Sequence, residues 1–425
     1  MNLVRNQQKA LYTLLSIFVF FAFLSPLSLI IPIFLLCLMG CSLIFLDENN
    51  VLYFLTFCAC FMNCLTNQKA FFLVSLAILF VLICKHFILS IKNKDKQKYW
   101  LILLVFIFSL VLFIYSLIVN NFKIYKLFQS LGLVAYLLML YLVNNVDIKK
   151  ISLILALGLI VSSLLSIISY SCGIYIIKPF TYTLNEFRFG AYFKYVNALA
   201  LYCALCQACL LSLFLTNKLN FKKWFWLLPI ITIIGLATLS KSFILITIIT
   251  YAISILIGFI LSNNKKTYIK ILFLGFIFIL FAILIAHTYF EKLFNRFFSA
   301  KQYGSLFNVI TTGRVGIWKG YLKDWISSPL KILFGSGITA NFLDGYSPHN
   351  LYIAILYRFG LAGIIALICL LIFVLRKHKT ATRFACYIPI LILLINVFFE
   401  DITSSLFTCL PLFIAFLFIF KDNKT

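Results

Sequence analysis

The stretch RVGIWKGYLKDWISSPLKILFGSGITANFLDGYSPHN, residues 314–350, lies within the longest polar interruption of an otherwise hydrophobic chain. Its first part has apolar residues at helical spacing, namely Val315, Trp318, Tyr321, Leu322 and Trp325. This spacing predicts an aromatic-faced helix with Arg314 in its first turn, ended by Pro329. The glycines at 335–337 predict a flexible turn, after which His349 directly precedes the next apolar run. An arginine and a histidine thus stand where polar and apolar sequence meet.

The composition around this stretch is typical of a membrane protein. Of 425 residues, 64% are hydrophobic and 11% are charged, and the mean hydropathy is +1.09. These values lie far outside the range of soluble domains, and apolar runs recur along nearly the whole length. We therefore expect an all-α, polytopic integral membrane protein with a single membrane domain over residues 1–425. In that setting, the aromatic-faced helix is expected to lie at the membrane interface.

The distribution of basic residues predicts the orientation of the chain. The net charge is +25, but most Lys and Arg stand in short connectors between apolar runs, which membrane orientation explains without nucleic acid. With both termini cytoplasmic, the cytoplasmic connectors and tails hold 20 Lys and Arg, and the short outward loops hold three. The positive-inside rule therefore predicts cytoplasmic termini and a large outward loop at 290–350, which itself carries seven basic residues.

The apolar segments predict about 12–14 transmembrane helices. Residues 10–46 contain Pro26 and Pro32, which favour a hairpin of two short spans over one long helix. Residues 225–262 are long enough for two helices joined by a tight outward turn, and Lys241 is the only charge within them. The other spans are expected at about 51–66, 70–91, 99–119, 127–143, 151–170, 197–216, 271–289, 351–375, 384–399 and 402–420.

The 13 cysteines do not indicate a metal centre or a disulfide framework. Most lie in apolar runs, where thiols behave as small packing residues, as in the groups Cys58, Cys60, Cys64 and Cys203, Cys206, Cys209. No His or carboxylate accompanies these groups, as a zinc site would require. Only Cys172 falls in an expected outward loop, at about 171–196. We therefore expect no metal and no cofactor.

Motifs in the C-terminal half follow a recognisable order. An arginine and a tryptophan in a helix precede a proline, an FG-x-G turn, and a histidine and asparagine that open a helix with G-x-x-G. The corresponding residues are Arg314, Trp318, Pro329, FGSG at 334–337, His349, Asn350 and GLAG at 360–363. In these motifs the chain resembles the O-antigen ligase and polysaccharide polymerase family, membrane glycosyltransferases that use lipid-linked sugar donors. The resemblance extends over about residues 185–400.

Two earlier elements are also similar to that family. Arg188, Gly190 and Asn197 correspond to its arginine, glycine and asparagine before a helix. Ser240-Lys241 corresponds to a Ser-Arg pair at a tight outward turn. The lysine keeps the positive charge but lacks the bidentate fork of arginine.

The resemblance implies an inverting, metal-independent transfer of glycan from an undecaprenyl pyrophosphate carrier to a sugar hydroxyl. His349 is expected to act as the general base that takes the proton of the acceptor hydroxyl. Arg314, Arg188 and Lys241 are expected to neutralise the pyrophosphate, because the sequence has no Asp-x-Asp motif to hold a metal.

Other polar residues have more limited roles in this interpretation. Trp318 and Asn350 are expected to contact substrate. Among carboxylates, Glu400 is the strongest alternative base. Weaker candidates are Glu186, Asp324, Asp344 and Asp401. Asp324 follows Lys323 directly and is expected on a solvent-facing side of its helix.

Three functions remain open at this point. A polymerase that joins O-antigen or capsule repeat units is preferred, in the bacterial inner membrane with its site facing the periplasm or cell exterior. Its expected partners are the lipid-linked oligosaccharide donor, the glycan acceptor and the lipid bilayer, with a chain-length regulator protein as a further candidate and no nucleic acid. A ligase that attaches finished polysaccharide to the lipid A core of lipopolysaccharide shares the motifs. A flippase or secondary transporter is less favoured, because the sequence has no internal repeat and its charges gather in outward loops.

Overall fold

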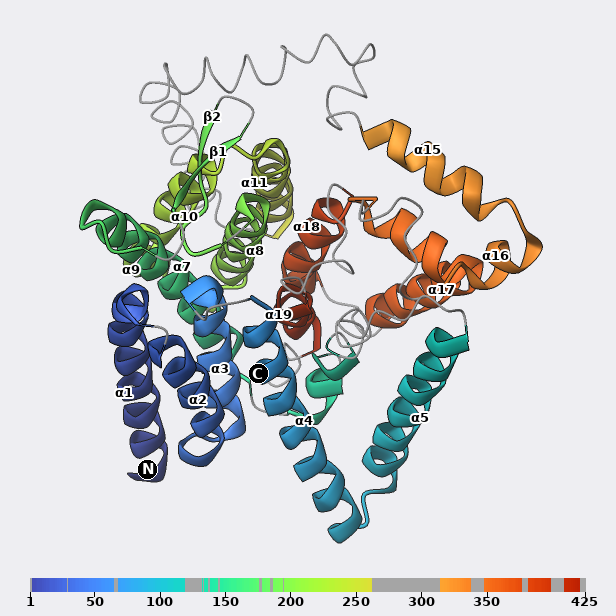
Figure 1. Ribbon diagram of the computed structural model, residues 1–425, viewed down its shortest axis with the longest axis horizontal. Coiled ribbons are helices and arrows are strands. Elements are labelled where there is room, and N and C mark those ends of the chain that lie inside the picture. The colour runs from blue at the N-terminus through green and yellow to red at the C-terminus, as the bar shows by residue number, and fades with distance from the viewer. Residues whose placement is uncertain are drawn as a thin grey trace.

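The part of the chain described by the computed structural model is almost wholly helical (Figure 1). The described residues are 2–28, 30–64, 68–118, 132, 134–136, 138–143, 146–175, 178–183, 186–193, 195–261, 314–337, 348–376, 381–398 and 409–420. The helical class predicted from sequence is confirmed there. A short two-stranded antiparallel ribbon was not predicted.

The N-terminal helices are joined by short connections. They are α1 (Asn2–Leu24), α2 (Ile30–Phe45), α3 (Glu48–Cys58), α4 (Gln68–Lys92) and α5 (Lys96–Ile118), with 3-10 turns at Ser25–Leu27 and Ala59–Cys64. Pro26 lies in the first of these turns, and Pro32 lies in the first turn of α2, where a missing N–H costs no helical hydrogen bond. The predicted helical hairpin at 10–46 is therefore confirmed.

The middle of the chain contains the ribbon and the most buried helix. Its elements are α7 (Ile148–Ser171), β1 (Phe180–Thr183), β2 (Glu186–Phe189), α8 (Val196–Leu215), α9 (Phe221–Trp224), α10 (Leu227–Ala237) and α11 (Lys241–Leu261). The ribbon occupies the predicted outward loop at 171–196. Helices α10 and α11 confirm the predicted helix pair within 225–262.

The C-terminal elements include a broken helix. They are α15 (Arg314–Trp325), α16 (Pro329–Phe334), α17 (Leu351–Arg376), a 3-10 segment (Ala381–Tyr387), α18 (Ile388–Asn396) and α19 (Cys409–Phe420). The prediction that Pro329 ends the amphipathic helix is wrong in detail. Helix α15 ends at Trp325, and Pro329 opens α16, because proline fits the first position of a helix.

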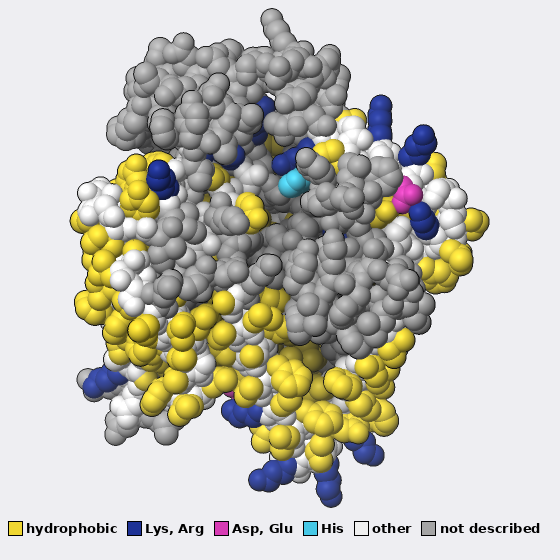
Figure 2. All heavy atoms as spheres, viewed as in Figure 1, with side chains coloured by type: hydrophobic (Ala, Val, Ile, Leu, Met, Phe, Trp, Pro, Cys, Tyr) yellow, Lys and Arg dark blue, Asp and Glu magenta, His cyan; other side chains and the backbone are white. Residues whose placement is uncertain are grey.

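Five helices of the described chain are long and apolar enough to cross a membrane, by length and composition. They are Asn6–Leu27, Ala70–Lys92, Ile148–Ser171, Val196–Leu215 and Lys241–Phe259. Hydrophobic side chains cover much of the described surface between two ends at which Lys and Arg gather (Figure 2). These features suggest a membrane protein. The predicted span at 271–289, much of that at 127–143, and the loop at 290–313 lie outside the described residues.

Helix α8 is the centre of the helical bundle. It packs against α7, α10, α11 and α18, and 94% of its membrane-length apolar stretch is buried inside the protein. Its many Ala, Cys and Ser residues allow these helices to approach closely. Gln207 of α8, fully buried, donates a hydrogen bond to Thr232 Oγ1 of α10 and accepts one from Thr247 Oγ1 of α11 at 3.1 Å. This polar contact ties three helices together within the apolar core.

Candidate functional site

Arg188, on β2, is tied by its guanidinium to two other segments. Its Nε donates a hydrogen bond to the carbonyl oxygen of Thr238 at 2.9 Å, and its Nη2 donates to Oδ1 of Asn197 at 3.0 Å. Thr238 follows α10, and Asn197 lies in the first turn of α8. The motif residues Arg188 and Asn197 are therefore in contact. Lys241 begins α11 a few residues after Thr238, at the same end of the bundle.

The turn between α10 and α11 is short and closely packed. Leu239 has a left-handed backbone with a φ of 51°, which a bulky residue rarely adopts. The Thr238 hydroxyl donates to the carbonyl of Gly235 at 2.6 Å and accepts from the N–H of Ser240 at 3.2 Å. A Cβ at Gly235 would overlap the ring of Phe243, so the absence of a side chain lets the two helices meet. These contacts fix the direction in which α11 begins.

Trp318 docks α15 against the loop that precedes α17. Its indole Nε1 donates to the carbonyl oxygen of Pro348 at 2.7 Å, and its ring meets Phe398 edge-on at 5.5 Å between centroids. Arg314 lies one helical turn before Trp318 and therefore on the same side of α15. Because Pro348 directly precedes His349, this contact brings the helix of Arg314 against the loop of His349.

The aromatic face of α15 packs on protein. Trp318 is 7% exposed and Tyr321 is 1% exposed. The ring of Tyr321 meets that of Tyr357 on α17 edge-on, with centroids 4.8 Å apart. Two rings of this face are therefore covered by protein, and the position of α15 at the membrane interface stays a prediction. Helical spacing identified an apolar face, but spacing alone does not distinguish burial against lipid from burial against a neighbouring helix.

His349 is held in an unusual backbone conformation at the start of α17. Its φ is 48°, in the left-handed region, and its side chain is half-buried. Such a conformation costs on the order of 1 kcal/mol for a residue other than glycine and is found preferentially at functional sites. The next residue but one, Leu351, is anchored by its N–H to the carbonyl of Val397 at 2.9 Å, which joins this segment to the end of α18.

Asn350 caps α17. Its Oδ1 accepts hydrogen bonds from the N–H groups of Tyr352 at 3.0 Å and Ile353 at 3.2 Å, and the residue is 2% exposed. This is the usual work of asparagine at a helix N-terminus. Helix capping by itself therefore explains an asparagine directly after His349. Substrate contact by Asn350 or by the buried Trp318 stays a prediction.

Helix α17 is interrupted at Gly360, which has a φ of 64°. The interruption leaves backbone carbonyls of α17 without helical partners. N–H groups of the glycine-rich turn after α16 donate hydrogen bonds to them. The N–H of Ser336 donates to the carbonyl of Tyr357 at 2.7 Å, and the N–H of Gly337 donates to that of Arg358 at 3.2 Å. The two motifs FGSG and GLAG are therefore halves of one contact.

Two glycines make this contact possible. A Cβ at Gly335, where φ is 77°, would overlap the backbone of Arg358. A Cβ at Gly360 would overlap the backbone of Leu333. Each glycine therefore lets the opposite main chain approach, and both adopt backbone angles that other residues disfavour. The turn predicted to be flexible at 335–337 is in fact docked on α17.

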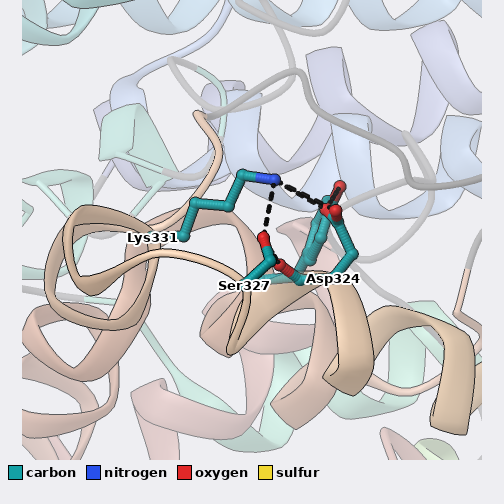
Figure 3. Close-up of polar contacts among 4 residues, drawn as sticks. Asp324, Ser327 and Lys331 are labelled. Atoms are coloured by element: carbon teal, nitrogen blue, oxygen red, sulfur yellow. Dashed lines mark hydrogen bonds and ion pairs between the residues drawn. The ribbon is translucent and has the colours of Figure 1, made fainter.

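Asp324 links α15, α16 and α17. Its carboxylate accepts from Lys331 Nζ at 3.0 and 3.1 Å and from the hydroxyl of Tyr357 at 2.7 Å (Figure 3). Lys331 also contacts Ser327 Oγ at 3.4 Å. Burial alone would raise the pKa of Asp324, but the hydrogen bonds from Tyr357 and Lys331 outweigh it and lower the pKa. The expectation that Asp324 faces solvent is met only in part, because its side chain is 24% exposed and the chain turns back through α16 to bring Lys331 to it.

Arg358 is a candidate functional residue that was not predicted from the sequence. It lies on α17 just before the break at Gly360, and it is 3% exposed. A signal was present in the sequence, since an arginine within an apolar helix is costly to bury and usually has a specific role.

The described candidates form two groups, one around Arg188 and Lys241 and one around Arg314 and His349. In Figure 1, β1, β2 and α15 lie at the upper end of the view, and the α4–α5 connection lies at the opposite end. Figure 2 shows a histidine side chain among Lys and Arg side chains at the upper end. Glu400 lies outside the described residues, as do Asp344 and Asp401, and the side chain of Glu186 is not described.

The described groups combine fixed cations with an imidazole. Guanidinium and ammonium groups stabilise phosphate oxygens, and a histidine can accept a proton near neutral pH. Among the described residues, no group of three or more His, Cys, Asp or Glu is arranged to hold a metal. No protein-family model matches the chain, and no curated protein matches it.

Proposed function

We propose that this chain is a membrane glycosyltransferase that moves a glycan from an undecaprenyl pyrophosphate carrier to a sugar hydroxyl, and that its reaction is the polymerisation of polysaccharide repeat units. The observation that carries the proposal is the pairing of distant motif residues. Arg188 bonds Asn197 and the turn before Lys241, and Trp318 joins the helix of Arg314 to the loop of His349. Each contact joins segments that helix formation alone would not bring together.

In the proposed reaction, the acceptor hydroxyl attacks the anomeric carbon of the donor sugar from the side opposite the pyrophosphate. His349 takes the hydroxyl proton as the new carbon–oxygen bond forms, and later releases it to solvent. The bond between the anomeric carbon and the pyrophosphate oxygen breaks, and the leaving group departs with its electron pair. Arg314, Arg188 and Lys241 stabilise the negative charge that develops there.

The proposal includes about 12–14 spans in the bacterial inner membrane, with the site facing outward. A matched pair of exposed lysines tests this orientation. In a background without accessible native cysteines, Lys319→Cys on α15 is expected to react with a membrane-impermeant thiol reagent in cells whose outer layer is permeabilised. Lys94→Cys, between α4 and α5, is expected to react only after lysis. The reverse pattern would place the candidate site in the cytoplasm and exclude the proposed mechanism.

Glycan analysis of a deletion strain separates the proposed reaction from ligation. Loss of long chains with single repeat units still attached to their acceptor indicates a polymerase. Complete loss of attached polysaccharide, with long chains still on the lipid carrier, indicates the ligase reaction on lipid A core. Loss of surface glycan together with accumulation of carrier-linked units on the cytoplasmic side would instead contradict transfer and favour translocation. Complementation by the wild-type chain is the control in each case.

A further inference from the structure

An apolar patch is exposed on α16 and in the turn between α15 and α16. Its members are large side chains that are 49–69% exposed: Ile326, Leu330, Leu333 and Phe334. A patch of exposed apolar side chains on a folded protein marks a contact with a partner or a membrane. The glycine contacts and the Asp324 hydrogen bonds hold α16 on α17, so these side chains are presented on a fixed surface. We call them the α16 patch.

The charge distribution around the α16 patch suits a lipid surface. The only charged residue within α16 is Lys331, and its ammonium turns back to Asp324 and Ser327. The patch therefore carries no outward charge of its own. On the preceding helix, Lys319 and Lys323 are exposed one helical turn apart. Amphipathic segments that lie in a membrane interface combine an apolar face with such basic residues, which meet anionic lipid headgroups.

The α16 patch also adjoins apolar surface on α17. A Cβ at Gly360 would overlap the backbone of Leu333, so the two elements meet at this point. Beyond Gly360, α17 exposes apolar side chains on one stripe, with exposed fractions of 38–59%: Leu361, Ile365, Ile368 and Ile372. In a membrane protein such a stripe faces acyl chains. The α16 patch and the exposed stripe of α17 together form one apolar surface.

We propose that the α16 patch is a lipid-contact surface, seated in the outer leaflet of the bilayer with Lys319 and Lys323 at the level of anionic headgroups. This extends to α16 the interfacial position that the sequence suggested for the helix at 314–325. Because the turn directly after α16 is bonded to α17 through Ser336 and Tyr357, the seat of α16 in the leaflet also sets the height of His349 relative to the membrane surface. The proposal does not depend on glycan transfer.

Photocrosslinking in a defined bilayer tests the lipid contact. The full chain is purified and reconstituted in vesicles of phosphatidylcholine and phosphatidylglycerol, with Phe334 replaced by the photoreactive residue p-benzoylphenylalanine. Ile365 on α17 is the matched lipid-facing reference, because its exposed fraction of 59% is nearly that of Phe334, 58%. Lys178, exposed beside β1, is the polar reference. Leu330 provides a second position in the patch should the Phe334 variant fold poorly.

After irradiation, mass spectrometry is expected to find phospholipid adducts at Phe334 or Leu330 as often as at Ile365, and several-fold more often than at Lys178. A crosslinked dimer of the chain as the main product at the patch would overturn the proposal in favour of contact between copies. Adduct yields as low as those at Lys178, with Ile365 reacting normally, would show that the patch faces water and would equally overturn it. Neither result depends on enzymatic activity.

Discussion

Two carboxylates at opposite ends of the molecule are centres of similar polar contacts. Glu48, the first residue of α3, contacts Lys85 Nζ and His86 Nε2 of α4, each at 2.9 Å. Asp324 contacts Lys331 and Tyr357 at 2.7–3.1 Å. We call these groups the Glu48 hub and the Asp324 hub. Both carboxylates have a lowered pKa, so each hub favours the folded state when its carboxylate is ionised.

The two hubs differ in what they hold together. The Glu48 hub joins two neighbouring helices of the N-terminal bundle, near the α4–α5 connection. The Asp324 hub joins the helix that carries Arg314 to the broken helix that begins after His349. The comparison teaches that similar polar chemistry serves general stability at one end and the geometry of the candidate site at the other. Paired substitutions at the two hubs therefore separate folding from transfer.

The largest expected difference is between the two histidines. His349→Ala should accumulate normally yet lose product formation by about 10²–10⁴-fold, as expected for removal of one acid–base group. His86→Ala, in the Glu48 hub, should retain transfer and lose only thermal stability. Product formation is measured per mole of purified protein with lipid-linked repeat units as donor. Equal activity of the two alanine variants would remove His349 from the chemistry.

The second contrast concerns the shape of a cation. Arg314→Lys should lower the turnover about 10–10²-fold, because an ammonium cannot reproduce the paired hydrogen bonds of a guanidinium on pyrophosphate. Lys85→Arg at the Glu48 hub should leave turnover unchanged, since an arginine also pairs with a carboxylate. Turnover and donor binding are measured on the same preparations. Wild-type rates in the Arg314→Lys variant would show that charge alone suffices at this position.

The third contrast compares the carboxylates directly. Asp324→Asn and Glu48→Gln each remove the charge of a carboxylate that contacts two side chains. Each substitution is expected to lower the free energy of unfolding by about 1–3 kcal/mol. Only Asp324→Asn should also reduce turnover, by about tenfold, because it loosens the placement of Arg314 relative to His349. Thermal unfolding in detergent and turnover in vesicles give the two readouts. Equal turnover in both variants, at equal loss of stability, would make Asp324 a purely structural residue.

The smallest expected effect is a pH dependence of stability. The hydrogen bond with His86, helped by Lys85, lowers the pKa of Glu48 from 4.5 to about 2 against the effect of burial. The folded-state pKa is depressed, so this stabilisation is present above about pH 4.5 and is lost as the pH falls toward about 2. Glu48→Gln should flatten the acid side of the thermal-stability profile. An unchanged acid profile in that variant would show that protonation of Glu48 does not contribute to the pH dependence of stability.

Much of the helical fold was readable from the sequence. The hairpin at Pro26 and Pro32 and the helix pair around Lys241 follow from run length and proline position, which are local properties. The ribbon that carries Arg188 was not predicted, because four-residue strands give little periodic signal among aromatic residues. Its position depends on hydrogen bonds to segments far along the chain.

The candidate site was only partly readable. Motif order identified Arg188, Arg314 and His349, but not the contacts that bring their segments together. The docking of Gly335 on the backbone of Arg358, and of Gly360 on that of Leu333, requires two segments to fold before they meet, and no local pattern reveals it. The same limit explains why the protein contacts of Trp318, Tyr321 and Asp324 were not predicted. In each case the contact comes from a segment that folds back from further along the chain.

Reconstituted transfer by a matched pair of glutamine variants tests the central account most directly. Glutamine preserves hydrogen bonding but cannot accept a proton at neutral pH. Wild-type protein, His349→Gln and His86→Gln are compared in vesicles that contain lipid-linked repeat units and a metal chelator, and the products are separated by chain length. The account predicts extended chains from the wild type and from His86→Gln, and none above background from His349→Gln. Extension by His349→Gln at the wild-type rate, or none by the wild-type protein, would contradict it.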